Sequence, residues 1–403
     1  MEKPVAVIEI TDSCVRLLIG NVVNGKPVII YSSEKPIAGV VSRGEILNFA
    51  ALTQLLNSLT DFKYDELRLH VTISEATVIF PPIGFQVYQV DKTTNVVSPT
   101  SIIESIDIQN AISLVQKEIV PGGSEIVDII PDAFILEQGR TFVNPPVGEK
   151  SNFITIKAKV HAMPGRVISS YREVVENAHI RAKRCLIAPY ATCDYIRSVP
   201  DMPRNYLLMD INDGYTALNL VNVHSPIVSG HFLLGQNDLV LRVSQQFGID
   251  EDEAKRIINL YGISEREMSF EPVITQSVLD DGTRREFTQN DLNRVIRGFM
   301  DDYLKQFDVT YGELLSGYSE ELKKLPVIFV GELTKVNGIK EILEEKFSEA
   351  NSVTMLDSNV VGAHGSKWAT AVGALLVSSR YKGSLTDQRA KVSQVGRVEQ
   401  GKK

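Results

Sequence analysis

The stretch Tyr206-Leu-Leu-Met-Asp-Ile-Asn-Asp-Gly-Tyr-Thr-Ala-Leu-Asn-Leu-Val221 lies near the middle of a chain of 403 residues. An apolar run reaches a carboxylate at Asp210, and a polar turn, Asn212-Asp213-Gly214, follows it. Alternation of apolar and polar residues then resumes from Thr216. Two such runs joined by a short turn that contains glycine are typical of a β-hairpin.

A second stretch near the N-terminus has the same form. The apolar run Val5–Ile10 leads into the polar turn Thr11-Asp12-Ser13, and the run from Val15 to Val23 leads out of it. Two hairpins with the same strand–turn–strand pattern, far apart in the sequence, indicate a chain built from two related halves.

Length and charge narrow the class of protein. A chain of 403 residues predicts two to three domains, and 43% apolar with 23% charged residues is ordinary for a globular protein. The net charge of −8 argues against a nucleic-acid-binding surface, which needs a basic patch.

Cysteine and histidine patterns favour neither a disulfide framework nor a metal site. The three cysteines form no CxxC pair, and their odd number favours a reducing compartment such as the cytoplasm. The six histidines lack metal-ligand spacing, so we expect ordinary core and surface residues. These residues are Cys14, Cys185, Cys193, His70, His161, His179, His224, His231 and His364.

The two ends of the chain predict neither a signal peptide nor a membrane span. Met1-Glu-Lys-Pro runs directly into a strand pattern, and no apolar run reaches 18 residues. Residues 383–403 are polar and predict a disordered tail. The valines at 392, 395 and 398 recur every third residue, but a membrane-surface helix normally carries Trp, Phe or Leu, so a solvated tail is favoured.

The remaining sequence alternates between helix and strand patterns, with a small α+β segment at residues 82–164. We expect helices over Phe49–Leu59, Ile106–Val120, Arg166–Ala178, Ala188–Arg197, Gln236–Phe247, Glu251–Leu260, residue 289 to about Phe307, Gly338–Phe347 and Trp368–Val377. Further strands are expected over Val28–Tyr31, Glu66–Ile73, Ile83–Val90, Ile126–Leu136, Asn152–Val160 and Pro326–Val330.

The two hairpins, each carrying a carboxylate, resemble the actin and sugar-kinase superfamily. In that superfamily two hairpins clamp the phosphates of a nucleotide from opposite domains, and a glycine-containing turn packs on the adenosine. The strand Pro326–Val330 followed by Gly331 is similar to the strand and turn of that adenosine site.

Four further stretches resemble the bacterial cell-division family FtsA, whose members are actin homologues. In the family's order, the matching stretches are Val41–Asn48, Lys157–Ala162, Gly235–Asp238 and Trp368–Leu376. The resemblance covers residues 4–381. It implies an α/β, actin-like (ribonuclease-H-like) two-domain fold with an FtsA-type α+β insert subdomain. The implied subdomains are IA (1–81, 165–204 and 361–382), IC, the insert (82–164), IIA (205–235 and 311–360) and IIB (236–310).

The phosphate hairpins depart from the family pattern. The first usually opens Asp-Ile-Gly-Thr/Ser, whereas here it is Glu9-Ile10-Thr11-Asp12. The second usually reads Asp-Ile-Gly-Gly-Gly-Thr-Thr-Asp, whereas here Asn212 and Asp213 replace two glycines. Phosphates approach backbone N–H groups closely only where no Cβ intrudes. An added carboxylate ~4 Å from a phosphate charge would cost ~4 kcal/mol at an effective dielectric of ~20.

The rest of the implied nucleotide site is altered as well. The family's Glu and Lys for sugar and base fall on Lys255 and Ile258, and Glu332 stands where a second glycine is common. We therefore expect a degenerate site without catalytic residues, metal or cofactor, at which ATP with Mg²⁺ binds weakly or not at all. The residues of this site would be Asp12, Ser13, Asp210, Asn212, Asp213, Gly214, Thr216, Lys255, Gly331 and Glu332.

The resemblance implies a non-enzymatic, pseudo-ATPase scaffold of the divisome. Such a protein works in the cytoplasm at the inner face of the membrane, at the septum. It binds the acidic C-terminal tail of the tubulin-like protein FtsZ and other division proteins, and associates with itself in filaments or dimers. Candidate contacts for the tail are Arg284, Arg285, Arg294 and Arg297, although the two arginines of the family's long helix fall on Phe299 and Asp301.

Two other functions remain open. An active ATPase or small-molecule kinase would need intact phosphate hairpins and a catalytic base. A pilus or secretion assembly adaptor of the same architecture lacks an amphipathic anchor of its own, which suits a tail without aromatic residues after Tyr381. Such an adaptor generally keeps a nucleotide site, which does not suit these hairpins. With no direct anchor visible in the tail, a division protein would reach the membrane through other subunits, or its anchor has been removed, or the protein works elsewhere.

Overall fold

The computed structural model describes residues 4–64, 69–118, 120–264, 272–278, 282, 284–316, 318, 322 and 324–380. The predicted disordered tail, residues 383–403, lies outside these ranges. Within them, no helix combines the length and the hydropathy that crossing a membrane requires.

The first of two large sheets has five strands in the order β13-β8-β1-β2-β3. The first hairpin and the next strand form an antiparallel edge, and the other two strands lie parallel to β1. The strands are β1 (Val5–Ile10), β2 (Cys14–Val23), β3 (Lys26–Pro36), β8 (Glu75–Phe80) and β13 (Arg181–Ile187).

The second large sheet repeats this topology in the order β16-β15-β14-β19-β20. The central hairpin and β16 are antiparallel, and two parallel strands follow on the other side of β14. The strands are β14 (Tyr206–Ile211), β15 (Thr216–Asn222), β16 (Ser225–Phe232), β19 (Val327–Val330) and β20 (Val353–Met355). The matched strand orders confirm two related halves.

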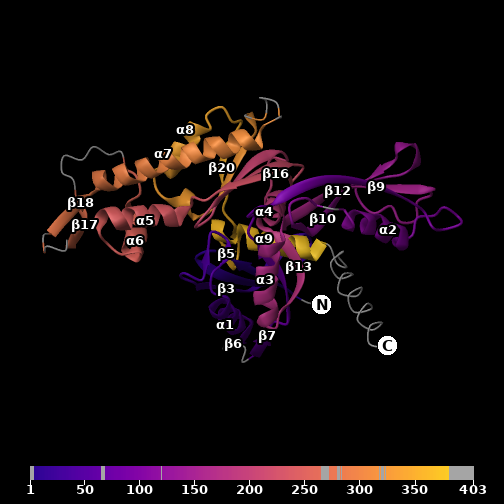
Figure 1. Cartoon of the computed structure of the whole chain (residues 1–403), viewed down its shortest axis with the longest axis horizontal. Helices are drawn as coiled ribbons and strands as arrows, with labels where there is room; N and C mark the ends of the chain where they lie inside the picture. Colours follow the sequence, from indigo (N-terminus) through magenta and orange to yellow (C-terminus); the bar gives the residue numbers. More distant parts are fainter. Residues whose placement is uncertain are drawn as a thin grey trace.

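Two helices rich in small residues lie between the sheets (Figure 1), α4 (Ala188–Ser198) and α9 (Ala369–Arg380). One buried cluster joins side chains from both helices and from the facing surfaces of both sheets. A Cβ at Gly373 would overlap the carbonyl of Ala191, so glycine is needed where the helices approach most closely. This shared core connects the two halves of the molecule.

Each sheet has a separate set of helices packed on its outer face. A buried apolar cluster lies between each sheet and its helices. The first sheet packs against α1 (Phe49–Thr60) and α3 (Gly165–Asn177). The second packs against α5 (Gln236–Phe247), α6 (Glu251–Tyr261), α7 (Gln289–Leu314) and α8 (Ile339–Lys346). A hairpin of β17 (Val273–Val278) and β18 (Arg284–Thr288) lies beyond α5 and α6.

The segment after the first sheet's β8 forms a four-stranded sheet in the order β11-β10-β12-β9, with helix α2 on one face. It projects to one side of the molecule (Figure 1). Its elements are β9 (Gln86–Asn95), α2 (Ser105–Gln116), β10 (Ser124–Ile135), the one-turn η2 (Glu137–Gly139), β11 (Thr141–Phe142) and β12 (Phe153–Pro164).

Short elements complete the described chain. They are β4 (Val41–Ser42), β5 (Glu45–Ile46), β6 (Asp61–Tyr64), β7 (Leu69–Thr72), η4 (Glu332–Lys335), β21 (Asn359–Val360), β22 (Ala363–His364) and η5 (Ser366–Trp368). The three cysteines are buried, and none of them is in a disulfide.

The structure corrects several predicted boundaries. The strand expected from Ile83 begins at Gln86, and the helix expected to reach Val120 ends at Gln116. The helix expected to end near Phe307 continues to Leu314 because its buried stripe continues along the second sheet. The strand β13 was not predicted because its basic residues interrupt the apolar pattern of the sequence.

Candidate functional site

The turns of the two related hairpins meet across the cleft between the halves. The Ser13 hydroxyl, in the β1–β2 turn, donates to Oδ2 of Asp213 in the β14–β15 turn at 2.6 Å. A hydroxyl that donates to a carboxylate forms a short, strong hydrogen bond. The resemblance to actin homologues places phosphates between these hairpins, and here the hairpins bind each other.

Close packing beside this hydrogen bond depends on Gly214. The Asp12 carboxylate accepts from the backbone N–H groups of Arg43 and Gly44, the latter at 2.8 Å. A Cβ on Gly214 would lie less than 3.0 Å from Oδ2 of Asp12, a separation that real Cβ atoms essentially never show. Glycine at 214 therefore permits the first turn to touch the second.

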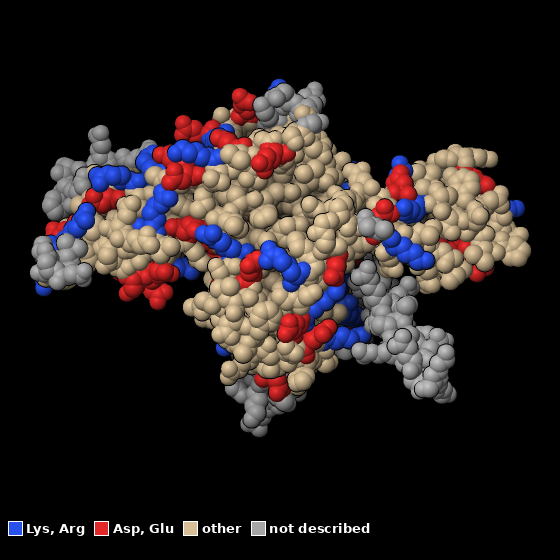
Figure 2. All heavy atoms as spheres, viewed as in Figure 1, with Lys and Arg blue, Asp and Glu red and all other residues tan. Residues whose placement is uncertain are grey.

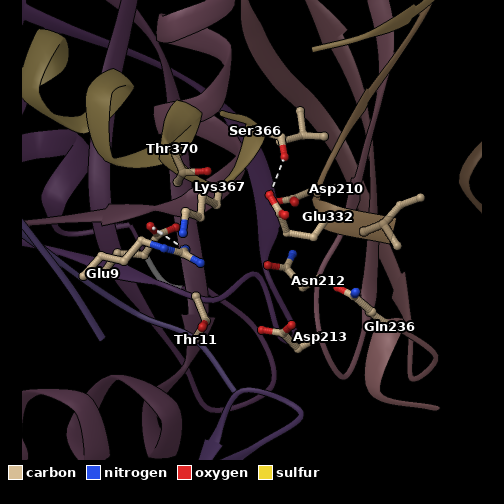
Figure 3. Close-up of a pocket in the computed structure, with 14 residues that line it drawn as sticks. Glu9, Thr11, Asp210, Asn212, Asp213, Gln236, Glu332, Ser366, Lys367 and Thr370 are labelled. Atoms are coloured by element: carbon tan, nitrogen blue, oxygen red, sulfur yellow. Dashed lines mark hydrogen bonds and ion pairs between the residues drawn. The ribbon is translucent and has the colours of Figure 1, made fainter. Parts of the chain in front are cut away.

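Behind the two turns lies a cavity of about 40 Å³ (Figure 3). A buried water needs roughly 10–15 Å³ measured this way, so the cavity has room for roughly three waters. Sites for small-molecule ligands usually measure roughly 300–1,000 Å³. The lining residues are Glu9, Thr11, Arg16, Asp210, Ile211, Asn212, Asp213, Gln236, Val330, Gly331, Glu332, Ser366, Lys367 and Thr370.

The two cations of the lining are already paired with carboxylates. Arg16 binds Glu9 at 3.1 Å and Glu34 at 2.8 Å, and Lys367 binds the other oxygen of Glu34 at 3.0 Å. Burial raises the pKa of Glu9, and the Arg16 guanidinium opposes that rise. A ligand phosphate would have to compete with these carboxylates for both cations.

The Asp210 carboxyl, at the end of β14, lies in a strongly perturbed environment. Burial, with the Glu9 and Asp213 carboxylates nearby, raises the pKa of Asp210 to about 7. Asp210 is thus partly protonated near neutral pH, because its loss of solvent outweighs the opposing effects of the Asn212 side chain and the Arg16 guanidinium on the pKa.

The backbone N–H groups at the N-terminus of α5 also have hydrogen-bond partners within the chain. The N–H groups of Gln236 and Asn237 donate to the carbonyls of Asn212 and Asp213, at 3.1 and 2.8 Å. The N–H of Gly235 donates to the Asp238 carboxylate at 2.8 Å. Free N–H groups at a helix N-terminus are a common anion site, and here the second hairpin occupies them.

The structure brings most of the predicted site residues together. Asp210, Asn212, Asp213, Gly331 and Glu332 line the cavity. Asp12, Ser13 and Gly214 lie at the contact between the turns.

Two predicted residues lie elsewhere. Thr216 is fully buried, where its hydroxyl bonds the Leu234 carbonyl and the Tyr303 hydroxyl inside the second half. Lys255 is exposed on α6 and is absent from the cavity lining.

The structure adds site residues that the sequence patterns did not single out, among them Arg16, Glu34, Gln236, Ser366, Lys367 and Thr370. One signal was available: the hairpin register places Glu9 directly opposite Arg16. Opposite charges facing each other on two apolar strands predict a buried ion pair. Contacts made by η5, by contrast, depend on the tertiary fold.

The predicted partner-binding arginines lie on the outer part of the second half. Arg284 and Arg285 are exposed on β18, and the Arg285 guanidinium lies 4.8 Å from the centre of the Phe287 ring. Arg294 and Arg297 are exposed on α7, where Arg294 pairs with Asp291 at 3.4 Å. Figure 2 shows Lys and Arg mixed with Asp and Glu over this lobe.

Neither residue at the positions of the family's arginines could replace them. Phe299 is fully buried on α7, and Asp301 is exposed but acidic. Among the described residues, no three His, Cys, Asp or Glu side chains are grouped as a metal site would require.

Comparisons with known proteins agree with the architecture. The PilM–PilN type IV pilus biogenesis complex contains a chain that superposes with a TM-score of 0.62, at 14% identity, over 93% of this chain and 98% of that one. At this identity the likeness shows the fold alone. The protein is thus of the actin-like fold, and a hydrogen bond joins the turns of its two hairpins.

Sequence relatives make the assignment more specific. Cell division protein FtsA of Borreliella burgdorferi is 23% identical over 69% of this chain and 68% of that protein. FtsA of Bacillus subtilis is 20% identical over 72% of this chain and 66% of that protein. No protein-family model matches the sequence. The chain is a divergent, FtsA-like protein of the actin fold, which supports a cell-division or assembly scaffold.

Proposed function

We propose that this chain is a scaffold of bacterial cell division that works without binding or hydrolysing ATP. The observation that carries the proposal is the direct contact between the phosphate hairpins, Ser13 to Asp213, in front of a cavity of about 40 Å³. A triphosphate would have to separate the hairpins and displace carboxylates from both cations of the lining. Neither change is favoured beside the added acidic residues.

The scaffold binds partners through the outer lobe of the second half. That lobe, made of α5, α6, the β17–β18 hairpin and the first part of α7, presents Arg284, Arg285, Arg294 and Arg297 to solvent. Exposed arginines suit an acidic, extended peptide because each guanidinium offers several donors to a carboxylate. The FtsZ C-terminal tail is such a peptide. The protein then works at the inner face of the membrane at the division site, held there by other subunits.

A pull-down on an immobilised FtsZ C-terminal tail peptide tests this function. Wild-type protein should be retained, and Arg284→Glu with Arg285→Glu should reduce retention at least tenfold. The matched control, Arg166→Glu with Arg172→Glu on α3, changes the net charge equally in the first half and should be retained like the wild type. Equal retention of both variants would contradict the assigned surface.

The pilus adaptor remains the second candidate because the match to the PilM–PilN complex covers 93% of this chain. A parallel pull-down with a PilN protein separates the two functions. Retention by PilN but not by the FtsZ tail would replace the division scaffold with an assembly adaptor.

A further inference from the structure

The Asp213 carboxylate lies where the family resemblance expects a ligand phosphate. It belongs to the second half of the molecule, yet its partner at 2.6 Å is the Ser13 hydroxyl of the first half. Asp213 also lines the cavity, so this acidic side chain lies at the border between the turn contact and the space behind it. A carboxylate and a phosphate oxygen accept the same hydrogen bonds.

Arg43 adds a second link between the halves at the same place. Its backbone N–H donates to Asp12, and its guanidinium reaches Asp238 on α5 at 3.4 Å. Gly214 packs against the backbone and side chain of Arg43 as well as against Asp12. One exposed ion pair contributes at most about 1 kcal/mol, so Arg43 supports the contact between the turns rather than replacing it.

The segment η5, which leads into α9, makes a third link. Lys367 binds Glu34 of β3 at 3.0 Å, and the neighbouring Ser366 hydroxyl donates to Glu332, the first residue of η4, at 2.8 Å. Adjacent residues therefore bind one half each. Figure 3 shows the Ser366 contact and the Lys367 side chain at the same border of the cavity.

From these contacts we infer that Asp213 is a built-in replacement for a ligand anion, which holds the cleft closed without any nucleotide. By the resemblance to actin homologues, the phosphates of a bound nucleotide would contact both hairpins. In this chain the second hairpin supplies the anion itself. The closed arrangement is then a constant property of the scaffold. The inference rests on the proposed ATP-independent function and extends it to the position of the two halves.

Spin labels on opposite halves would measure the closure. Lys35→Cys on β3 and Glu341→Cys on α8 are exposed, whereas the three native cysteines are buried and should stay unlabelled. Wild type should give one narrow distance distribution, unchanged by inorganic phosphate or Mg-ATP. Asp213→Gly should give a longer or broader distribution, and millimolar inorganic phosphate should restore the narrow one by filling the vacated anion position.

Two further variants complete the test. Ser13→Ala should open the cleft from the other half, and phosphate should not restore it because the hydroxyl donor is missing. Asp357→Gly is the matched control, since Asp357 pairs with Lys335 within the second half, and it should keep the wild-type distribution. If Asp213→Gly does not fold, the spin-label distance distribution of Ser13→Ala alone tests whether the contact between the turns holds the cleft closed.

A wild-type distance distribution in both Asp213→Gly and Ser13→Ala would overturn the inference. An opened Asp213→Gly variant that phosphate does not close would also overturn the assigned anion position. These results differ from a failure of the proposed function, which would show as Mg-ATP binding by the wild-type protein.

Discussion

Asp210 is a buried carboxyl group whose surroundings change the pH range in which it titrates. It keeps the carboxylate of the family pattern, but burial raises its pKa to about 7 from an ordinary value of 3.8. The folded protein therefore holds a proton on Asp210 at a pH where the unfolded chain has lost it. Stability from this group is fully present below pH 3.8 and is lost as pH rises toward 7.

Asp210→Asn removes this titration while keeping the shape of the side chain. As the pH rises from 5 to 8, the wild type should lose about 3 kcal/mol of its free energy of unfolding through this group, and the variant should not show this loss. Each pKa unit corresponds to about 1.4 kcal/mol. Urea unfolding of both proteins across that range measures the difference. A difference that is constant with pH would contradict the raised pKa.

Gly214 is the residue whose lack of a side chain allows the hairpins to touch. Gly214→Ala should destabilise the protein by about 1–3 kcal/mol, because the new Cβ overlaps the Asp12 carboxylate unless the halves separate. Thermal or chemical unfolding measures the effect.

Gly298→Ala on α7 is the control for that substitution, because apart from its chain neighbours and the backbone of its own helix no atom lies within 4 Å of the added Cβ. In a helix interior the same change should stabilise by about 0.5–1 kcal/mol. Equal effects at the two positions would contradict a close contact at Gly214.

At the scale of elements, buried charge joins the projecting insert to the first sheet. Arg184 on β13 pairs with Asp128 on β10 at 2.7 Å, and both side chains are almost completely buried. Each residue lies at an irregularity of strand register, where β-bulges commonly redirect side chains. This pairing explains the arginine at position 184 of β13, and no local pattern could reveal it.

Arg184→Met should cost about 3–5 kcal/mol because it leaves the Asp128 carboxylate buried without its partner. Adding Asp128→Leu should recover most of that loss, since the unpaired charge is removed. Chemical denaturation measures both variants. Arg140→Met, which breaks an exposed pair with Glu149 in the same insert, should cost less than about 1 kcal/mol. A loss of similar size in all three proteins would contradict a special role for the buried pair.

Elements that depend on local sequence patterns were predicted, and elements that depend on tertiary contacts were not. Hairpins and amphipathic helices were predicted because apolar periodicity and turn residues are local. The β17–β18 hairpin was not predicted, since β17 and β18 carry polar residues on their exposed faces and only Ile274 and Phe287 are buried apolar anchors. The extra length of α7 likewise comes from its packing partner.

For the whole molecule, the repeated hairpins predicted two related halves, and the actin-like fold was predicted from the resemblance of several stretches in a shared order. The hairpins also supplied most of the predicted site residues that the structure places near one another. The contact of Ser13 with Asp213 and the bridging by Ser366 and Lys367 could not be predicted. Both depend on how two separately folded sheets are placed against α4 and α9.

The central claim is that the cleft is closed by the chain itself and leaves no place for a nucleotide. Isothermal titration calorimetry of the wild-type protein with Mg-ATP at millimolar concentration tests it most directly, with Mg²⁺ alone as the blank. The contacts between the hairpins predict no heat beyond dilution. Saturable binding of Mg-ATP in this concentration range would contradict the account.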